Sequence, residues 1–209
     1  TLKSEFKMTL NHDNYNFDTG IISYEELQTA KSSDRYQYVL PYYNFNKTFN
    51  DQFMKGTMSF SSSGNNNLNN TNQLKSNIIN NLVYDGQTYI SNLGIANKFN
   101  INLKNLNSIG KNYSEYKSSP QTEFVSIFSF NSSLPLKKID GNYQSYLTPK
   151  ASLRINPSDM KNYSTSNKKI DVGNIFNLNR LGLSDTHEAG RSLTLGIDFK
   201  KEKISKKNT

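Results

Sequence analysis

Residues that could carry out acid–base, nucleophilic or metal chemistry are few in this chain of 209 residues. The chain has no cysteine, which excludes disulfides and thiolate metal ligands within it. Its two histidines are His12 and His187. Glu188 follows His187, but no second histidine stands four residues later, so the zinc-protease helix motif is absent. We therefore expect no enzymatic activity, no cofactor and no metal site.

Phosphate-binding and hydrolase motifs are missing too. The sequence has no P-loop, no Gly-x-Ser-x-Gly, and no glycine-rich turn between a strand and a helix. Its acidic residues are dispersed, so no pair of carboxylates suggests a glycosidase. These absences favour a binding, transport or structural role.

Basic side chains are the polar residues whose placement is informative. The net charge is +8, but the lysines are scattered apart from the segment KKEKISKK near the end. Because no nucleic-acid-binding motif accompanies them, we expect no nucleic-acid partner. Lys150 and Arg154 fall on the polar side of a strand-like run, where the lumen of a barrel would lie. Such a lining would favour anionic cargo, or it would serve only to solvate the lumen.

Strict alternation of apolar and polar residues defines the elements that carry these side chains. In SLTLGIDF, residues 192–199, every second residue is apolar, as in a strand with one apolar face. The pattern recurs along the chain and predicts about ten strands of roughly 9–14 residues. Strands of soluble sandwiches are shorter, about 5–6 residues, whereas tilted strands that cross a bilayer need about 9–11.

Composition agrees with strands that bury only one face. Only 34% of the residues are hydrophobic, yet aromatic residues make up 12%, and the mean hydropathy is -0.74. A disordered chain would have fewer aromatic residues. No stretch approaches the roughly 18 apolar residues of a membrane helix, and no apolar signal segment is present. A chain of this kind would meet a membrane only through its strands.

The predicted connections alternate roughly between short and long, as they do in outer-membrane barrels with short periplasmic turns and long outer loops. Pro41 and Pro149 fall inside strand-like runs, and each should mark a strand end, a bulge or a weakly paired position. The short links are expected at 47–52, 84–87 and 138–142, and the long ones at 61–73, 106–121 and 156–169.

The predicted fold is therefore all-β, an antiparallel segment of a transmembrane β-barrel with about ten strands of a larger barrel. A soluble or secreted β-sandwich is the main alternative, since it also alternates apolar and polar residues. A low-complexity, aggregation-prone chain is the third.

Residues 147–198 carry an ordered set of motifs, and this stretch resembles the C-terminal barrel region of the LptD (OstA) family of LPS-assembly outer-membrane proteins, especially its alphaproteobacterial members. The segments 34–49, 58–64 and 132–138 also look like this family, so the resemblance covers most of residues 34–200. The family-like residues are Leu147, Thr148, Pro149, Arg154, Pro157, Asp171, Phe176, Asn179, Arg180, Asp185, Glu188, Gly190 and Gly196.

The resemblance implies that residues 1–209 are part of a large barrel domain in the outer membrane of a Gram-negative bacterium. In the family a periplasmic jelly-roll domain precedes the barrel, and neither it nor the remaining strands are within this chain. Lipopolysaccharide arrives along a periplasmic Lpt bridge and leaves through a lateral opening into the outer leaflet. An LptE-like lipoprotein plugs the lumen, and the barrel performs no covalent chemistry. The resemblance would make lipopolysaccharide phosphates the partners of Lys150 and Arg154.

Two features depart from the family pattern. Its disulfide-forming cysteines do not appear here, and neither Pro41 nor Pro149 can be aligned with the prolines of its lateral opening. A porin-like channel would share every physical feature of the sequence but would not explain the motifs of 147–198. A secreted carbohydrate-binding β-sandwich or adhesin would instead bury its apolar faces in a core and dissolve without detergent.

Overall fold

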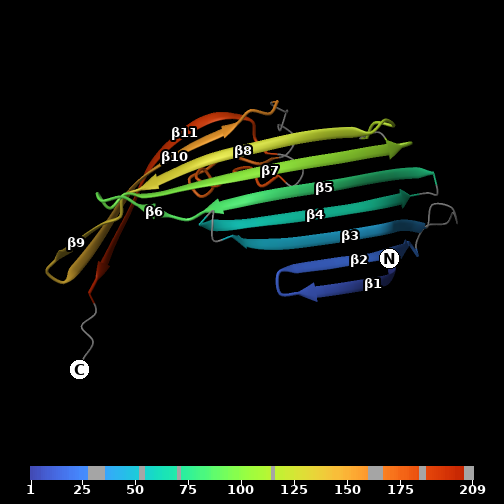
Figure 1. Cartoon of the computed structure of the whole chain (residues 1–209), viewed down its shortest axis with the longest axis horizontal. Helices are drawn as coiled ribbons and strands as arrows, with labels where there is room; N and C mark the ends of the chain where they lie inside the picture. The colour runs from blue at the N-terminus through green and yellow to red at the C-terminus, as the bar shows by residue number, and fades with distance from the viewer. Residues whose placement is uncertain are drawn as a thin grey trace, which may run out of the picture. The chain divides into compact units, whose positions relative to one another are not determined.

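The computed structural model describes residues 1–27, 36–51, 55–69, 72–113, 116–159, 167–183 and 187–204 (Figure 1). These ranges contain eleven strands and no helix, so none holds a helix long and apolar enough to span a membrane. The strands are β1 (Leu2–His12), β2 (Tyr15–Glu25), β3 (Tyr36–Asp51), β4 (Gly56–Asn69), β5 (Gln73–Gly86), β6 (Tyr89–Ile90), β7 (Ala96–Lys111), β8 (Gln121–Ser133), β9 (Leu136–Asp140), β10 (Tyr143–Asn156) and β11 (Gly190–Lys203).

The strands form one antiparallel sheet in the order β1-β2-β3-β4-β5-β7-β8-β10-β11. Two short strands lie off this path, with β6 paired to β7 and β9 paired to β10. The prediction of an all-β, antiparallel chain is confirmed. In the described part of the chain the sheet is open, because β1 and β11 do not pair with each other.

The chain divides into two compact units. The first comprises residues 1–53, 57–84 and 102–125, which include β1 to β3 and most of β4 and β5. The second comprises residues 54–56, 85–101 and 126–209, which include β6 and β9 to β11. Strands β4, β5, β7 and β8 each contribute a part to both units.

In the first unit, the register of β1 and β2 sorts side chains by polarity. Phe6 pairs with Ile21 and Leu10 with Phe17, and directly paired residues project to the same side of a sheet. Met8 lies on this apolar face and is 60% exposed. On the opposite, polar face the Lys7 ammonium lies 3.1 Å from the Asp18 carboxylate.

The second unit shows the same division. Leu153 pairs with Leu193 and Leu147 with Phe199, which forms an apolar face on β10 and β11. The alternate residues form the polar face, where Arg154 pairs with Ser192. The octet SLTLGIDF thus has the alternation that its sequence predicts.

Both prolines predicted to disturb the pairing lie at irregular positions. The β2–β3 register shifts between Gly20 and Ile22, opposite the stretch of β3 that contains Pro41. Pro149 lies where β10 changes partner, since β9 pairs with its first five residues and β8 with its last part. Between β8 and β9, the Leu134 amide donates to the Pro149 carbonyl at 3.0 Å, so the connection between these two strands is also bonded to β10. Both positions agree with the expectation for prolines in strands.

Three predicted connections are wrong. The short link expected at 47–52 is strand as far as Asp51, because β3 runs on to that residue. The Asn-rich stretch 61–73, expected to be a long loop, is mostly strand, and only residues 70–72 separate β4 from β5. The expected turn at 84–87 is strand as far as Gly86, and the chain reverses at 91–95, where the Ser91 amide donates to the Ile95 carbonyl at 2.9 Å. The other three links overlap their expected places, at 112–120, 141–142 and 157–189.

Candidate functional site

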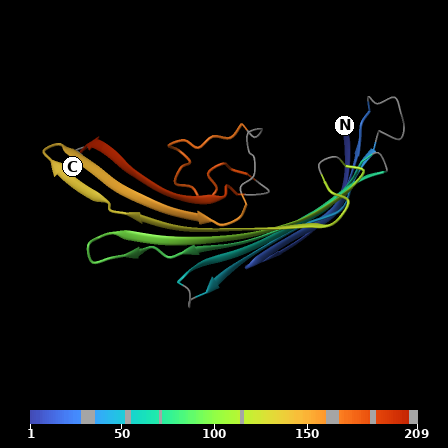
Figure 2. The ribbon, with the colours of Figure 1, turned by 90° about the horizontal axis from the view of Figure 1, so that it is seen from above.

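The connection between β10 and β11, residues 157–189, brings most of the family-like residues together. In Figure 2 it folds back to one side of these two strands within the second unit. The residues of β10 and β11 that it covers belong to the polar face, since Ser152, Arg154 and Thr194 are all buried. The described parts of this connection are residues 157–159, 167–183 and 187–189.

Two side chains at the end of β10 hold the connection in place. Arg154 is only 3% exposed, and its guanidinium donates to the carbonyls of Leu178 at 3.1 Å and Glu188 at 2.6 Å. Asn156 is 1% exposed, and its amide also donates to the Glu188 carbonyl, at 2.9 Å. Its side-chain oxygen accepts from the Ser158 amide at 3.1 Å, which fixes the direction of the chain as it leaves β10.

A buried ion pair stabilises the end of the connection that leads into β11. The Arg180 guanidinium donates to the two carboxylate oxygens of Glu188 at 2.9 and 2.5 Å. Their side chains are 8% and 16% exposed. A bidentate arginine–carboxylate pair combines charge with fixed geometry, so it holds residue 180 against the segment that enters β11.

The Phe176 side chain packs the middle of the connection against β11. A Cβ at Gly196 would lie 2.8 Å from the Phe176 ring, so the absence of a side chain there makes room for the aromatic group. The Lys150 ammonium lies 4.6 Å from the centre of this ring and 2.6 Å from the Asp198 carboxylate. The lysine therefore combines a cation–π contact with an ion pair across β10 and β11.

Asp171 and Asn179 stabilise turns within the connection. The Asp171 carboxylate accepts from the amides of Gly173 at 2.8 Å and Asn174 at 3.1 Å. The Asn179 side chain donates to the Leu183 carbonyl at 2.8 Å and accepts from its amide at 3.3 Å. Such side-chain-to-backbone bonds replace the pairing that a strand would provide.

The remaining family-like residues occupy the two strands and their ends. Leu147 and Pro149 lie on the apolar face of β10, and Thr148 pairs with Asp198 on the polar face. Pro157 follows β10 directly, and Gly190 begins β11 with a φ of 103°, a conformation that favours glycine. Asp185 lies outside the described residues.

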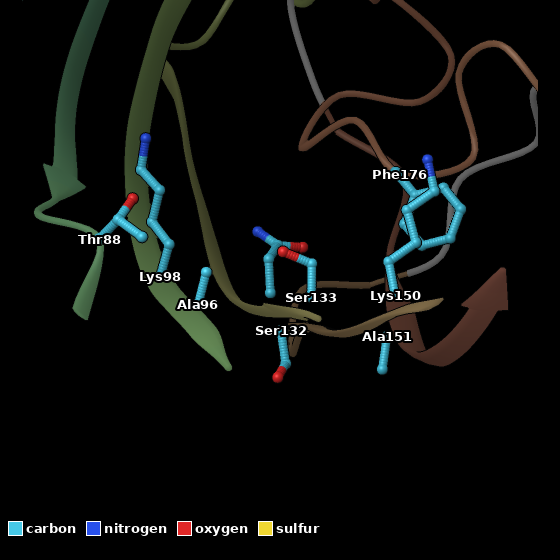
Figure 3. A pocket seen from close by; sticks show the side chains of 9 residues that line it. Thr88, Ala96, Lys98, Ser132, Ser133, Lys150, Ala151 and Phe176 are labelled. Carbon is cyan, nitrogen blue, oxygen red and sulfur yellow. The ribbon is translucent and has the colours of Figure 1, made fainter. Parts of the chain in front are cut away.

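A hollow of about 300 Å³ lies beside the connection, within the second unit (Figure 3). Lys98 of β7 and Lys150 of β10 point to the same side of the sheet there, with Phe176 above Lys150. The Lys98 ammonium lies 2.8 Å from the Asp85 carboxylate, so both lysines have an acidic partner. The lining also includes Thr88, Ala96, Asn131, Ser132, Ser133 and Ala151.

Lys150 and Arg154, the basic residues predicted to face a lumen, both lie on the polar face of β10. The structure gives them different surroundings: Lys150 borders the hollow, whereas Arg154 is buried beneath the connection. The sequence pattern did not reveal this burial, nor the acidic partners Asp85 and Asp198. The sequence pattern also gave no indication that Asn156, directly before Pro157, is a buried anchor of the connection.

The described residues contain no group of three or more His, Asp or Glu side chains placed to hold a metal ion. The site consists instead of a docked connection, its polar anchors and a small hollow bordered by two lysines. No protein-family model and no curated protein matches the chain.

Proposed function

We propose that this chain forms part of the wall of an outer-membrane β-barrel, with its apolar face toward lipid and its polar face toward the lumen. The exposed apolar face carries this proposal. On β11 alone, Leu193, Leu195, Ile197 and Phe199 are 66–73% exposed. A contiguous apolar surface of this kind marks a contact with lipid or with another protein surface.

Strand length favours lipid as the contact. Nine of the eleven strands have 11–16 residues, enough for the roughly 9–11 that a tilted strand needs to cross a bilayer. A β-sandwich would cover the apolar face with a second sheet about 10 Å away. The described residues form a single sheet, so they supply no such cover.

We further propose that this barrel is the LptD-like translocon that inserts lipopolysaccharide into the outer leaflet of a Gram-negative bacterium. The support is the resemblance of residues 147–198, whose motif residues gather around one docked connection. The proposed partners are lipopolysaccharide, an LptE-like lipoprotein in the lumen, a periplasmic Lpt bridge that acts through a jelly-roll domain, and outer-membrane lipid. The proposed role is transport without covalent chemistry.

Photo-crosslinking in living cells tests this proposal. A photoreactive amino acid would replace Leu153 on the apolar face or Lys150 on the polar face, in the protein that contains this chain. A lipopolysaccharide adduct that disappears when ATP-driven supply is blocked would support the translocon. Adducts to phospholipid at Leu153, with no lipopolysaccharide at either site, would favour a porin-like channel.

Carbonate washing of membranes separates the barrel from the β-sandwich. A barrel wall stays in the membrane pellet, whereas a secreted sandwich or adhesin appears in the wash. A soluble protein without lipid adducts would overturn both parts of the proposal.

A further inference from the structure

One face of β11 changes from apolar to basic along the strand. The four exposed apolar residues from Leu193 to Phe199 lie on it, and the next two positions of the same face are Lys201 and Lys203. All of these residues belong to the second unit, so the change does not depend on how the two units are placed.

Three strands lie side by side where this change occurs, β9, β10 and β11 (Figure 1). Leu147 of β10 pairs with Phe199 of β11 on one side and with Leu136 of β9 on the other. Directly paired residues project to the same side of a sheet, so these three exposed side chains form a line across the strands, which we call the apolar line.

Two lysines flank a serine at the next position of the same face. Ser145 of β10 pairs with Lys201 of β11 and with Lys138 of β9. Neighbouring strands are about 4.8 Å apart, so the two lysine backbones are roughly 10 Å apart, with only a small side chain between them. Their ammonium groups can approach one anion from two sides, and the serine hydroxyl can donate to the same anion.

Both lysine side chains extend away from the apolar line. The Lys201 ammonium lies 4.8 Å from the centre of the Tyr143 ring, and the Lys138 ammonium lies 3.9 Å from the Asp140 carboxylate. Tyr143 and Asp140 pair with each other one step further along the strands. Lysines at a membrane surface take this direction, because their stems can contact hydrocarbon while the charge stays in the polar layer. A tyrosine beside them is also typical of membrane surfaces.

We call four side chains at this end of the face the lysine patch: Lys138, Ser145, Lys201 and Lys203. Among the residues that the structure describes, Lys201 and Lys203 form no ion pair, and Asp140 is the one carboxylate on the patch. On the opposite face of the same strands, Lys200 is neutralised by the Glu202 carboxylate. The positive charge of the patch therefore complements an anion from outside the chain.

We propose that the lysine patch binds the headgroup of an anionic phospholipid such as phosphatidylglycerol. The phosphate would lie over Ser145, between Lys138 and Lys201, and the acyl chains would follow the apolar line. Lysine clusters that adjoin a membrane-embedded surface attract anionic lipids in this way. This inference rests on the proposed barrel function and names one lipid partner of the barrel wall.

The place of the patch favours phospholipid over lipopolysaccharide. It lies where β10 begins, after the two-residue link 141–142, whereas the long connection 157–189 follows the other end of this strand. Outer-membrane barrels have short turns in the periplasm and long loops outside. The leaflet of a Gram-negative outer membrane on the side of the short turns consists of phospholipid, and lipopolysaccharide occupies the other leaflet.

Fluorescence quenching by spin-labelled lipids tests the proposal. The chain has no cysteine of its own, so I197C provides one thiol in it for a fluorescent label, next to the apolar line. The protein that contains this chain, with any thiol outside it changed to serine, would be placed in phosphatidylcholine vesicles. Phosphatidylglycerol with a nitroxide on its acyl chain would be added in one series, and the matching phosphatidylcholine in another. The ratio of the two quenching curves measures the relative affinity of phosphatidylglycerol.

We expect phosphatidylglycerol to quench the label at lower mole fractions than phosphatidylcholine does. Each lysine near an anionic headgroup favours binding about fivefold, so K138Q combined with K201Q should lower the relative affinity roughly 10- to 25-fold. K137Q combined with K200Q is the matched control, because these two lysines flank Tyr146 in the same way on the opposite face. The control should leave the relative affinity unchanged.

The contrary outcomes separate this inference from the proposed function. Equal quenching by both labelled lipids would show that the protein is in the membrane but that the patch selects no headgroup. Displacement of the labelled phosphatidylglycerol by lipopolysaccharide, and not by unlabelled phosphatidylglycerol, would show that the occupant is wrong. If neither lipid quenches the label, the apolar face meets no lipid, and the barrel proposal fails as well.

Discussion

At the scale of single residues, Gly20 shows how closely side chains pack on the polar face of the first unit. A Cβ there would clash with the Phe6 carbonyl oxygen and would lie 2.9 Å from the Tyr42 ring. The Tyr42 ring crosses this gap, and its hydroxyl donates to the Glu5 carboxylate at 2.8 Å. The glycine thus lets one tyrosine join β3 to β1 across β2.

We predict that Gly20→Ala destabilises the folded protein by about 1–3 kcal/mol, the usual cost of overpacking. The Phe6 carbonyl belongs to the backbone, so it cannot move without separating β1 from β2. Urea unfolding in detergent micelles measures the effect. Ser23→Ala, in the same strand but at a position that already has a Cβ, is the control and should change the stability by less than about 0.5 kcal/mol. Equal effects would show that Gly20 does not limit the packing.

The Arg180–Glu188 pair gives a second prediction at this scale. Arg180→Met should cost about 3 kcal/mol, because it leaves a largely buried carboxylate without its partner. Protease cleavage within residues 167–183 should become faster, since the docked connection would detach. Arg180→Met combined with Glu188→Met should recover much of the loss, as both charges are then gone.

Lys138→Met is the matched control for this pair. Lys138 and Asp140 are 3.9 Å apart with side chains 78% and 83% exposed, so the loss of their pair should change little. If Arg180→Met were as mild as Lys138→Met, the ion pair would not hold the connection.

At the scale of strands, the sequence predicted the alternation and the two faces well. The period of two in SLTLGIDF is a local property, and the pairing of Leu153 with Leu193 follows it. The Asn-rich segment was misjudged because asparagine is poor in strands on average. Here the side chains of Ser62 and Asn80 bond across β4 and β5 and support the pairing.

The turn expected at Asp85-Gly86 failed for another reason. Asp-Gly is a strong turn signal, but Gly86 serves close packing, since a Cβ there would lie 2.7 Å from the Phe99 carbonyl.

The candidate site was predictable only in part. The alternation of apolar and polar residues predicted that Lys150 and Arg154 lie on the polar side of β10. The burial of Arg154 depends instead on the connection 157–189, which folds back over it.

The faces of β1 give a prediction at the scale of strands. Under the proposed barrel function, Met8→Arg would place a cation on the lipid-facing side of the sheet, which costs roughly 2–4 kcal/mol at mid-bilayer, so barrel assembly should fail or slow. Thr9→Arg, one residue away, places the same group on the polar face beside Asp18, its partner in β2, and should be tolerated. The yield of folded protein in the outer membrane measures both. Similar yields would refute the assignment of faces.

At the scale of the whole molecule, the open edges of the sheet matter most. Within the described residues β1 pairs only with β2, and β11 only with β10. Unpaired backbone groups are very unfavourable in lipid, so the proposed barrel would need both of these edges to be paired. We predict that the amides of β1 exchange hydrogen much faster in the isolated chain than in the assembled barrel. Amides of β2, paired on both sides, are the internal reference; slow exchange of β1 in the isolated chain would contradict the prediction.

The close pairing of cations with carboxylates has a consequence for conductance. Lys7 faces Asp18, Lys98 faces Asp85 and Lys150 faces Asp198. The net charge of the chain is +8, but each of these lysines is paired with a carboxylate. Each pair is therefore a dipole without net charge toward the water beside the polar face. At a distance beyond about 8–10 Å, the screening length at physiological salt, such dipoles exert almost no field. In the proposed barrel, these three paired lysines would therefore contribute little to any preference of the pore for anions over cations.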